Sequence, residues 1–296
     1  MCIRDRKSPE SWVIEPSHQE VMIDGKGIEK EFIFNVTAPK SEEVVKLRPE
    51  LTNDKEKIQA AIQEISYDHI PQQYMVQPSS TRAVALNLKT GVNRVAYING
   101  AGDNVAESIE AVGVIVEKFD SDDITLEKLK SFDAVILGIR AFNVHESLSY
   151  KKNVLWTYAH QGGNLLIQYN TTRGLKTRTI TPYSIELSRD RITDENSKVK
   201  MLDSKHPILN SPNKISLEDF EGWVQERGLY FPKKWDKNFS PLFEMSDPGE
   251  QPKRGALLVA NYGEGKVVYT GLSFFRQLPA GVPGAYRLFF NLIANK

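Results

Sequence analysis

The chain has 296 residues, with 38 basic and 38 acidic side chains, so its formal net charge is zero. No whole-molecule field therefore favours nucleic acid or an anionic membrane surface as a partner. The single cysteine, Cys2, excludes an internal disulfide and a cysteine-based metal cluster, and no run of about 18 apolar residues predicts a membrane span.

The first six residues, MCIRDR, are typical of a spurious start in a gene predicted on an assembled fragment. We therefore expect residues 1–6 to lie outside the fold, and we expect the chain to be the tail of a longer protein.

The pattern from residue 7 to about 90 predicts β-structure. In EFIFNVT, Phe32, Phe34 and Val36 recur at every second position, as on one face of a half-buried strand. Between residues 40 and 71 a helical stripe of isoleucines and the edge strand of a sandwich both fit the pattern. We predict a β-sandwich or, if the chain is truncated there, part of one.

From residue 91 the pattern changes, because apolar strands alternate with amphipathic helices. Strands are predicted over 93–100, 114–120, 133–139 and 164–170, and helices over 103–113, 125–132 and 147–163. This alternation predicts an α/β fold with a doubly wound, mostly parallel sheet and helices on both faces. A long insertion follows residue 171, and an antiparallel hairpin over 256–273 and a helix over 283–296 end the chain.

Several familiar site motifs are absent from the sequence. NGAGDN has Val105 where a dinucleotide fingerprint needs its third glycine, so we interpret it as a tight turn capped by Asp103 or Asn104. His145 and His206 lack the partners of known zinc motifs, and no GxSxG elbow occurs. We predict no metal site and no cofactor.

Polar side chains follow two neighbouring strands of the predicted sheet. Arg140 and Asn143 follow the third strand, whereas Tyr169, Asn170 and Arg173 end or follow the fourth. Because the carboxyl ends of parallel strands share one edge, these groups are expected to converge there. Guanidinium groups suit carboxylates, phosphates and sugar hydroxyls.

Further charged residues come from the later segments LSRDR and VQERGLYF. We expect Arg189, Glu226 and Arg227 to fold over the same edge and to join a ligand site. The alternative is an internal ion-pair network in which Glu226 and Asp190 neutralise the arginines. The equal counts of acidic and basic residues favour this alternative slightly.

Several long segments resemble a known family. YINGAGDNV, DAVILGIRAFN, QYNTTRGLKT, DFEGWVQERGLYFPKKW and GLSFFRQLPAGVPGAYRLF resemble the C-terminal region of large bacterial PIG-L (LmbE-like) deacetylase proteins. There, residues 7–90 correspond to an Ig-like β-sandwich. Residues 91–296 correspond to a ThuA-like domain with a flavodoxin-like, class I glutamine amidotransferase-like fold.

The resemblance implies a limited function for this chain. The zinc site of the deacetylases, built on a His-Pro-Asp-Asp motif, would lie in an N-terminal domain that this sequence lacks. Tyr169 and Asn170 stand where the amidotransferases carry their nucleophilic cysteine, and neither side chain replaces a thiolate. We expect a non-catalytic accessory module that binds a carbohydrate or another polar ligand, and the resemblance favours an extracytoplasmic location.

Two other functions stay open at this point. One is a cysteine-free hydrolase that uses a dyad of Glu226 and Arg227 or a metal held by His206. The other is a scaffold that docks the deacetylase domain or a partner through Phe274, Phe275 and Leu278. These three side chains fit a buried core better than an exposed contact surface, because phenylalanine and leucine are usually buried.

Overall fold

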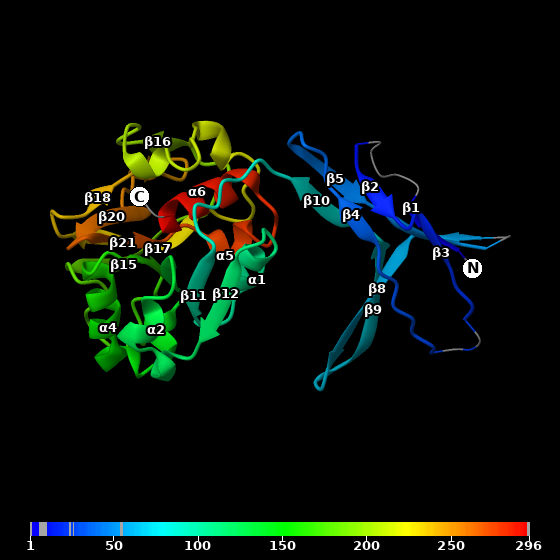
Figure 1. Cartoon of the computed structure of the whole chain (residues 1–296), viewed down its shortest axis with the longest axis horizontal. Coiled ribbons are helices and arrows are strands. Elements are labelled where there is room, and N and C mark those ends of the chain that lie inside the picture. The colour runs from blue at the N-terminus through cyan, green and yellow to red at the C-terminus, as the bar shows by residue number, and fades with distance from the viewer. Residues whose placement is uncertain (1, 6–10, 24, 26, 54–55, 295–296) are drawn as a thin grey trace. The chain divides into compact units, whose positions relative to one another are not determined.

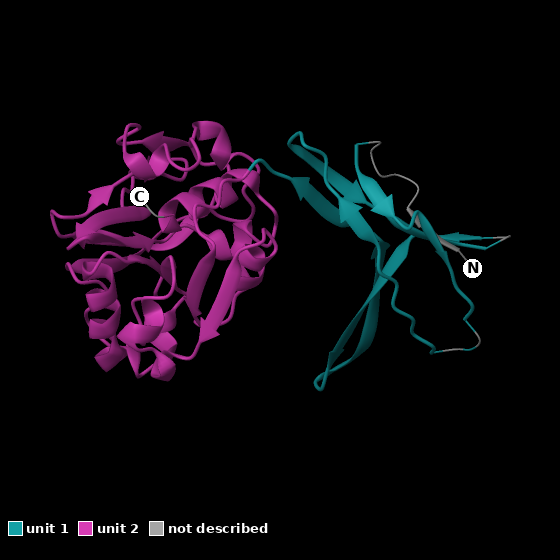
Figure 2. Ribbon diagram, viewed as in Figure 1, with its two compact units in different colours: residues 1–87 teal, residues 88–296 magenta. Residues whose placement is uncertain are grey.

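The computed structural model describes residues 2–5, 11–23, 25, 27–53 and 56–294 (Figure 1). The chain divides into two compact units, residues 1–87 and 88–296 (Figure 2). This division falls close to the boundary predicted near residue 90.

The first unit contains strands and no helix among its described residues. The strands are β1 (Cys2–Asp5), β2 (Val13–Glu15), β3 (His18–Glu20), β4 (Asn35–Thr37), β5 (Glu43–Leu47), β6 (Pro49–Thr52), β7 (Lys57–Ile58), β8 (Ala60–Tyr67), β9 (Ile70–Pro78) and β10 (Thr81–Ala85). They form four antiparallel sheets, ordered β3-β1-β6-β7, β10-β5, β2-β4 and β8-β9. The predicted β-character is therefore confirmed.

One local expectation needs correction, and one open alternative is decided by the structure. Residues 1–6 were expected outside the fold, but the backbone of Cys2–Asp5 forms β1 between β3 and β6. The isoleucine stripe that fitted a helix lies in the extended strands β7 and β8, so the strand alternative is right there.

The first unit buries few apolar side chains. Of the 17 exposed large hydrophobic residues in the described part of the chain, 13 precede residue 88. Trp12, Val21 and Ala85 are its buried apolar residues among those described. A packed interior between two facing sheets is therefore not established, and the Ig-like sandwich stays a prediction.

The second unit is built on a mixed sheet of seven strands. In spatial order they are β12 (Ile115–Phe119), β11 (Arg94–Ile98), β13 (Ala134–Leu137), β14 (Asn164–Gln168), β21 (Gly265–Thr270), β20 (Leu257–Tyr262) and β18 (Ser240–Pro241). The first five run parallel, β20 is antiparallel to β21, and β18 is antiparallel to β20. The predicted mostly parallel α/β sheet is confirmed, as is the late hairpin.

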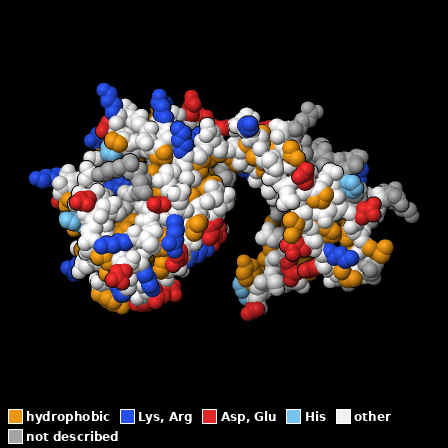
Figure 3. Space-filling model, viewed as in Figure 1, with side chains coloured by type: hydrophobic (Ala, Val, Ile, Leu, Met, Phe, Trp, Pro, Cys, Tyr) orange, Lys and Arg blue, Asp and Glu red, His pale blue; other side chains and the backbone are white. Residues whose placement is uncertain are grey.

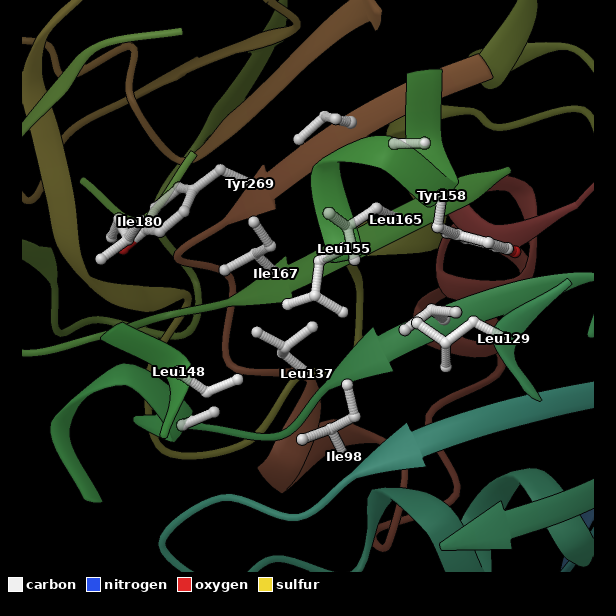
Figure 4. Close-up of a cluster of buried hydrophobic side chains, with 14 of the residues drawn as sticks. Ile98, Leu129, Leu137, Leu148, Leu155, Tyr158, Leu165, Ile167, Ile180 and Tyr269 are labelled. Carbon is white, nitrogen blue, oxygen red and sulfur yellow. The ribbon is translucent and has the colours of Figure 1, made fainter. Parts of the chain in front are cut away.

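The central strands of this sheet are buried on both faces, as expected of a parallel sheet covered by helices. The helices are α1 (Val105–Glu110), α2 (Leu126–Leu129), α3 (Ala141–Val144), α4 (Leu148–His160), α5 (Phe274–Gln277) and α6 (Pro283–Ile293). On one face, Leu137, Leu165 and Ile167 of the sheet pack against Leu155 and Tyr158 of α4 (Figure 4). Helix α6 packs on β13 and β14.

The insertion after β14 forms smaller elements beside this sheet. Strand β15 (Ile185–Ile192) pairs with β17 (Gly228–Trp235), and β16 (Val199–Met201) pairs with β19 (Phe243–Met245). Two short 3-10 helices, Pro207–Leu209 and Leu217–Phe220, connect them. A third, Ser121–Asp123, precedes α2.

Candidate functional site

Three loops meet at the carboxyl edge of the parallel strands β13, β14 and β21. Arg140 follows β13 with a left-handed backbone, at φ 57°, and its N–H donates to the carbonyl of Tyr169 at 2.8 Å. Tyr169 directly follows β14. The predicted convergence of the segments after these two strands is therefore observed.

Two of the predicted ligand residues instead hold these loops together. The Asn143 carboxamide donates to the carbonyls of Thr171 at 3.1 Å and Arg173 at 2.9 Å, and it accepts from the Thr171 N–H at 2.9 Å. Asn170 is fully buried, accepts from the Phe142 N–H at 3.0 Å and donates to the carbonyl of Gln168. Both amides therefore position the backbone.

The gap between β11 and β13, where the strand order reverses, is filled by the protein itself. A Cβ on Gly100 would lie 2.1 Å from the carbonyl oxygen of Ile139. The Asp103 carboxylate accepts from the Ile139 N–H at 3.2 Å, the Val105 N–H at 3.0 Å and the Tyr97 hydroxyl at 2.6 Å. Although sheets of this kind often bind ligands at such a point, backbone occupies it here. The N-cap residue of α1 is Asn104, whose side chain makes no cap bond; Asp103, one residue earlier, accepts from the N–H of Val105, the first residue of the helix.

Glu226 forms an internal ion-pair network. Its side chain is 5% exposed, and its two oxygens accept from Arg191 at 2.7 Å and Arg276 at 2.9 Å. For this carboxylate, the structure therefore shows the internal ion-pair network that the sequence offered as an alternative to a ligand site. Its partners are Arg191 and Arg276, whereas Arg189 is exposed.

Arg227 has different partners from its neighbour Glu226. Its guanidinium donates to the carbonyl of Ser197 at 3.2 and 3.1 Å and to that of Phe220, and it lies 5.7 Å from the rings of Phe220 and Trp223. Burial lowers the pKa of Arg227 to about 10. Glu226 and Arg227 therefore form no catalytic dyad.

Aromatic rings surround Tyr169 at the edge. Tyr230 stacks on it with ring centroids 6.1 Å apart, and Phe275 lies 5.3 Å away, with the Arg276 guanidinium 4.9 Å from the centre of the Phe275 ring. We call Arg140, Tyr169, Tyr230, Phe275 and Arg276 the rim. Tyr230 and Phe275 are partly exposed, so flat apolar surface lies beside two cations.

The Tyr169 hydroxyl is a donor without a partner among the described residues. The residue as a whole is only 7% exposed, but its hydroxyl oxygen is not fully buried. This oxygen therefore reaches solvent. Burial raises the pKa of Tyr169, whereas the charges of Arg140 and Arg276 act in the opposite direction. The hydroxyl therefore stays protonated beside two guanidinium groups.

The exposed arginines are the remaining predicted site residues. Arg140, Arg173 and Arg189 are exposed, and their guanidinium groups have no partner within the described part of the chain. Elsewhere on the visible face of this unit, acidic and basic side chains are intermingled (Figure 3).

Sequence reasoning missed Arg276 and treated Phe275 only as part of an apolar contact. The available signal was that both follow the strand over 265–270, which ends at the same edge. Of the proposed scaffold contact, Phe274 is fully buried and Leu278 is 1% exposed, so these two side chains belong to the core.

A pocket of about 480 Å³ lies at the opposite end of β20 and β21, beside His206, Val259 and Lys266. Its buried polar groups have structural partners: Lys266 donates to the carbonyl of Ala294 at 2.8 Å, and Asn291 donates to the carbonyl of Ile208 at 2.7 Å. His206 accepts from the Ile208 N–H through Nδ1. This pocket therefore offers fewer uncommitted groups than the rim.

Among the described residues, no group of three or more His, Cys, Asp or Glu side chains is arranged to hold a metal ion. In the same part of the chain, no helix is long and apolar enough to cross a membrane.

No family model and no curated protein matches the chain. Among solved structures it is similar to the cytoplasmic protein STM1381 from Salmonella typhimurium LT2, at 14% identity and a TM-score of 0.47 over 69% of this chain and 100% of that one. A putative GMP synthase subunit from Thermoplasma acidophilum is 12% identical, with a TM-score of 0.45 over 68% and 92%. A β-galactosidase from Rahnella sp. R3 is 15% identical, with a TM-score of 0.41 over 67% and 30%. These similarities carry no information on activity.

Proposed function

We propose that residues 88–296 form a non-catalytic binding module that holds a carbohydrate or another polar ligand at the rim. In the parent protein it would accompany a PIG-L-type N-acetyl-sugar deacetylase, as the sequence resemblance implies. The module would be of the ThuA-like, glutamine amidotransferase-like kind. The spatial order of its first four parallel strands, second, first, third and fourth along the unit, agrees with a flavodoxin-like sheet.

One observation carries this proposal. The Arg140 guanidinium and the Tyr169 hydroxyl have no partners within the described residues, and the Tyr169 ring contacts the partly exposed rings of Tyr230 and Phe275. Unpaired donors next to flat apolar surface suit a sugar, which presents hydroxyl oxygens at its edge and C–H groups on its face. A purely structural network would use these donors internally.

The backbone supports the same assignment. Among the described residues, the non-glycine residues with positive φ are Arg140, Gln225 and Tyr230. Two belong to the rim, and the carboxamide of Gln225 accepts from Arg276. Strained conformations of this kind gather at functional sites, where a side chain is needed in a position that glycine would occupy more easily.

Catalysis by this module has little support from its side chains. Residues 88–296 contain no cysteine, and by the sequence resemblance Tyr169 and Asn170 stand where an amidotransferase carries its nucleophile. Glu226 is bound by two arginines, and Arg227 is bound by backbone carbonyls. Among the described residues, no base and nucleophile are paired at this edge.

The test is calorimetric titration of the full chain against a panel of neutral and acidic oligosaccharides. Arg140→Ala and Arg173→Ala should each weaken binding, because both remove an exposed guanidinium from a loop at the edge. Arg94→Gln is the matched control, since Arg94 begins β11 at the opposite edge of the sheet. The proposal fails if no glycan binds, or if both loop variants bind glycans with the affinity of the unsubstituted chain.

A further inference from the structure

The rim, taken together with Glu226 and Arg191 beside it, carries more positive than negative charge. The three guanidinium groups of Arg140, Arg191 and Arg276 accompany the carboxylate of Glu226, so positive charges exceed negative charges by two within this set. Both oxygens of Glu226 are already engaged by Arg191 and Arg276. Glu226 makes no ion pair with Arg140, whose guanidinium has no partner among the described residues.

The donors available at the rim are arranged around Tyr169. The backbone of Arg140 is bonded to the Tyr169 carbonyl, and its guanidinium has no partner among the described residues. Arg276 reaches the same region across the ring of Phe275; its Nε and Nη1 groups already donate to Glu226 and Gln225, which leaves its Nη2 group for a ligand. The Tyr169 hydroxyl, which has no partner among the described residues, adds one neutral donor. Two cations and a hydroxyl donor form a binding set for an oxyanion.

We propose that the ligand of the rim is a sugar acid, held through its carboxylate by Arg140, Arg276 and the Tyr169 hydroxyl. This inference rests on the proposed carbohydrate-binding function and narrows its substrate class. A carboxylate is planar and matches the fork of a guanidinium group. The partly exposed rings of Tyr230 and Phe275 supply the flat surface for the sugar ring attached to that carboxylate.

The decisive comparison is between each sugar acid and its own methyl ester, which keeps the shape and removes the charge. We would titrate the full chain with trigalacturonate, a tetrasaccharide of hyaluronan and N-acetylneuraminate, each as acid and as ester. The acid that binds should do so at least about tenfold more tightly than its ester. Raising the salt from about 0.05 to 0.5 M should weaken binding of the acid and leave binding of the ester unchanged, because salt screens exposed charges.

Variants connect this charge preference to the rim. Arg140→Gln should reduce the affinity for the acid about tenfold, towards that of the ester. Arg276→Lys keeps a cation beside Glu226, so it preserves the fold, but it removes the fork and should also weaken acid binding. Arg94→Gln, at the opposite edge, should bind both forms as the parent does.

The possible failures are distinguishable. If some glycan binds and loses affinity in Arg140→Ala, but no acid binds more tightly than its ester, the proposed function stands and this inference is wrong. If no glycan of either kind binds, both are wrong. A preference for the acid that persists unchanged in Arg140→Gln and Arg276→Lys would also overturn the inference, because residues outside the rim would then bind the ligand carboxylate.

Discussion

Replacing Arg140 by glycine and by alanine separates the role of its backbone from that of its side chain. Arg140 has φ 57° and ψ 23°, in the left-handed region. That conformation costs a non-glycine residue roughly 1–2 kcal/mol, and glycine avoids the cost. Glycine also makes the unfolded chain more flexible, which offsets about 0.5–1 kcal/mol of the gain.

From these magnitudes, the free energy of unfolding of Arg140→Gly should lie between that of the unsubstituted chain and a value about 1.5 kcal/mol higher. Arg140→Ala keeps the backbone cost and should be less stable than Arg140→Gly by about 1 kcal/mol. Both variants lack the guanidinium, so both should lose the same share of glycan affinity. The expected pattern is therefore a difference in stability without a difference in binding.

The assay is urea unfolding followed by tryptophan fluorescence, with three of the four tryptophans, Trp156, Trp223 and Trp235, in the α/β unit. Calorimetric titration on the same preparations gives the binding side. A glycine variant less stable than the parent by more than about 1 kcal/mol would refute the reasoning, because the guanidinium would then be making a structural contact. Equal stability of the glycine and alanine variants would refute the assignment of backbone strain.

Three further outcomes follow from the same structure. Glu226→Gln should cost about 2–3 kcal/mol in urea unfolding, since it weakens two hydrogen bonds to a buried carboxylate. Glu186→Gln, a half-exposed carboxylate between two lysines, should leave the urea midpoint unchanged, and equal effects of the two changes would contradict this account. Gly100→Ala should lower the melting temperature by roughly 6–12 °C, the equivalent of about 3 kcal/mol in a unit of this size, because its Cβ would collide with a backbone carbonyl; an unchanged melting temperature would show that the two loops are not packed together. Burial raises the pKa of Tyr97, Tyr158 and Tyr269, so the folded state holds these protons more tightly than the unfolded chain does. Their contribution to stability is fully present below about pH 10, the pKa of an unfolded tyrosine, and should be lost as the pH rises above that value. Absorbance at alkaline pH checks this, and ionisation of all tyrosines near pH 10 without unfolding would contradict it.

The α/β unit was predictable because its signals are local. Each strand between residues 93 and 170 is a short apolar run, and each helix begins or ends at a residue with a known preference. Thr125 is an example: its side chain accepts from the Lys128 N–H at 3.3 Å, as expected of an N-cap. In the first unit the alternation in EFIFNVT indicated strands but not how the sheets pack, because most large apolar side chains there are exposed.

The composition of the site was harder to predict because it depends on pairing between distant segments. Strand β21 lies next to β14 in the sheet although about 100 residues separate them in the chain, and that pairing places Phe275 and Arg276 at the edge. The sequence indicated a hairpin over 256–273 but did not indicate which of its strands would join β14.

The sequence also could not separate positioning residues from residues with free donors. Asn143, Asn170 and Arg140 are all polar groups after strands, yet the two amides satisfy buried backbone groups of the neighbouring loop. Buried N–H and C=O groups must be paired, and a short carboxamide with both donors and an acceptor does this well. Arginine carries donors only and extends further from the backbone, so it is the side chain left to meet a ligand. The ion-pair network and the proposed ligand site are therefore compatible: Glu226 holds Arg276 in place from the interior, and the unpaired guanidinium of Arg140 stays available at the same edge.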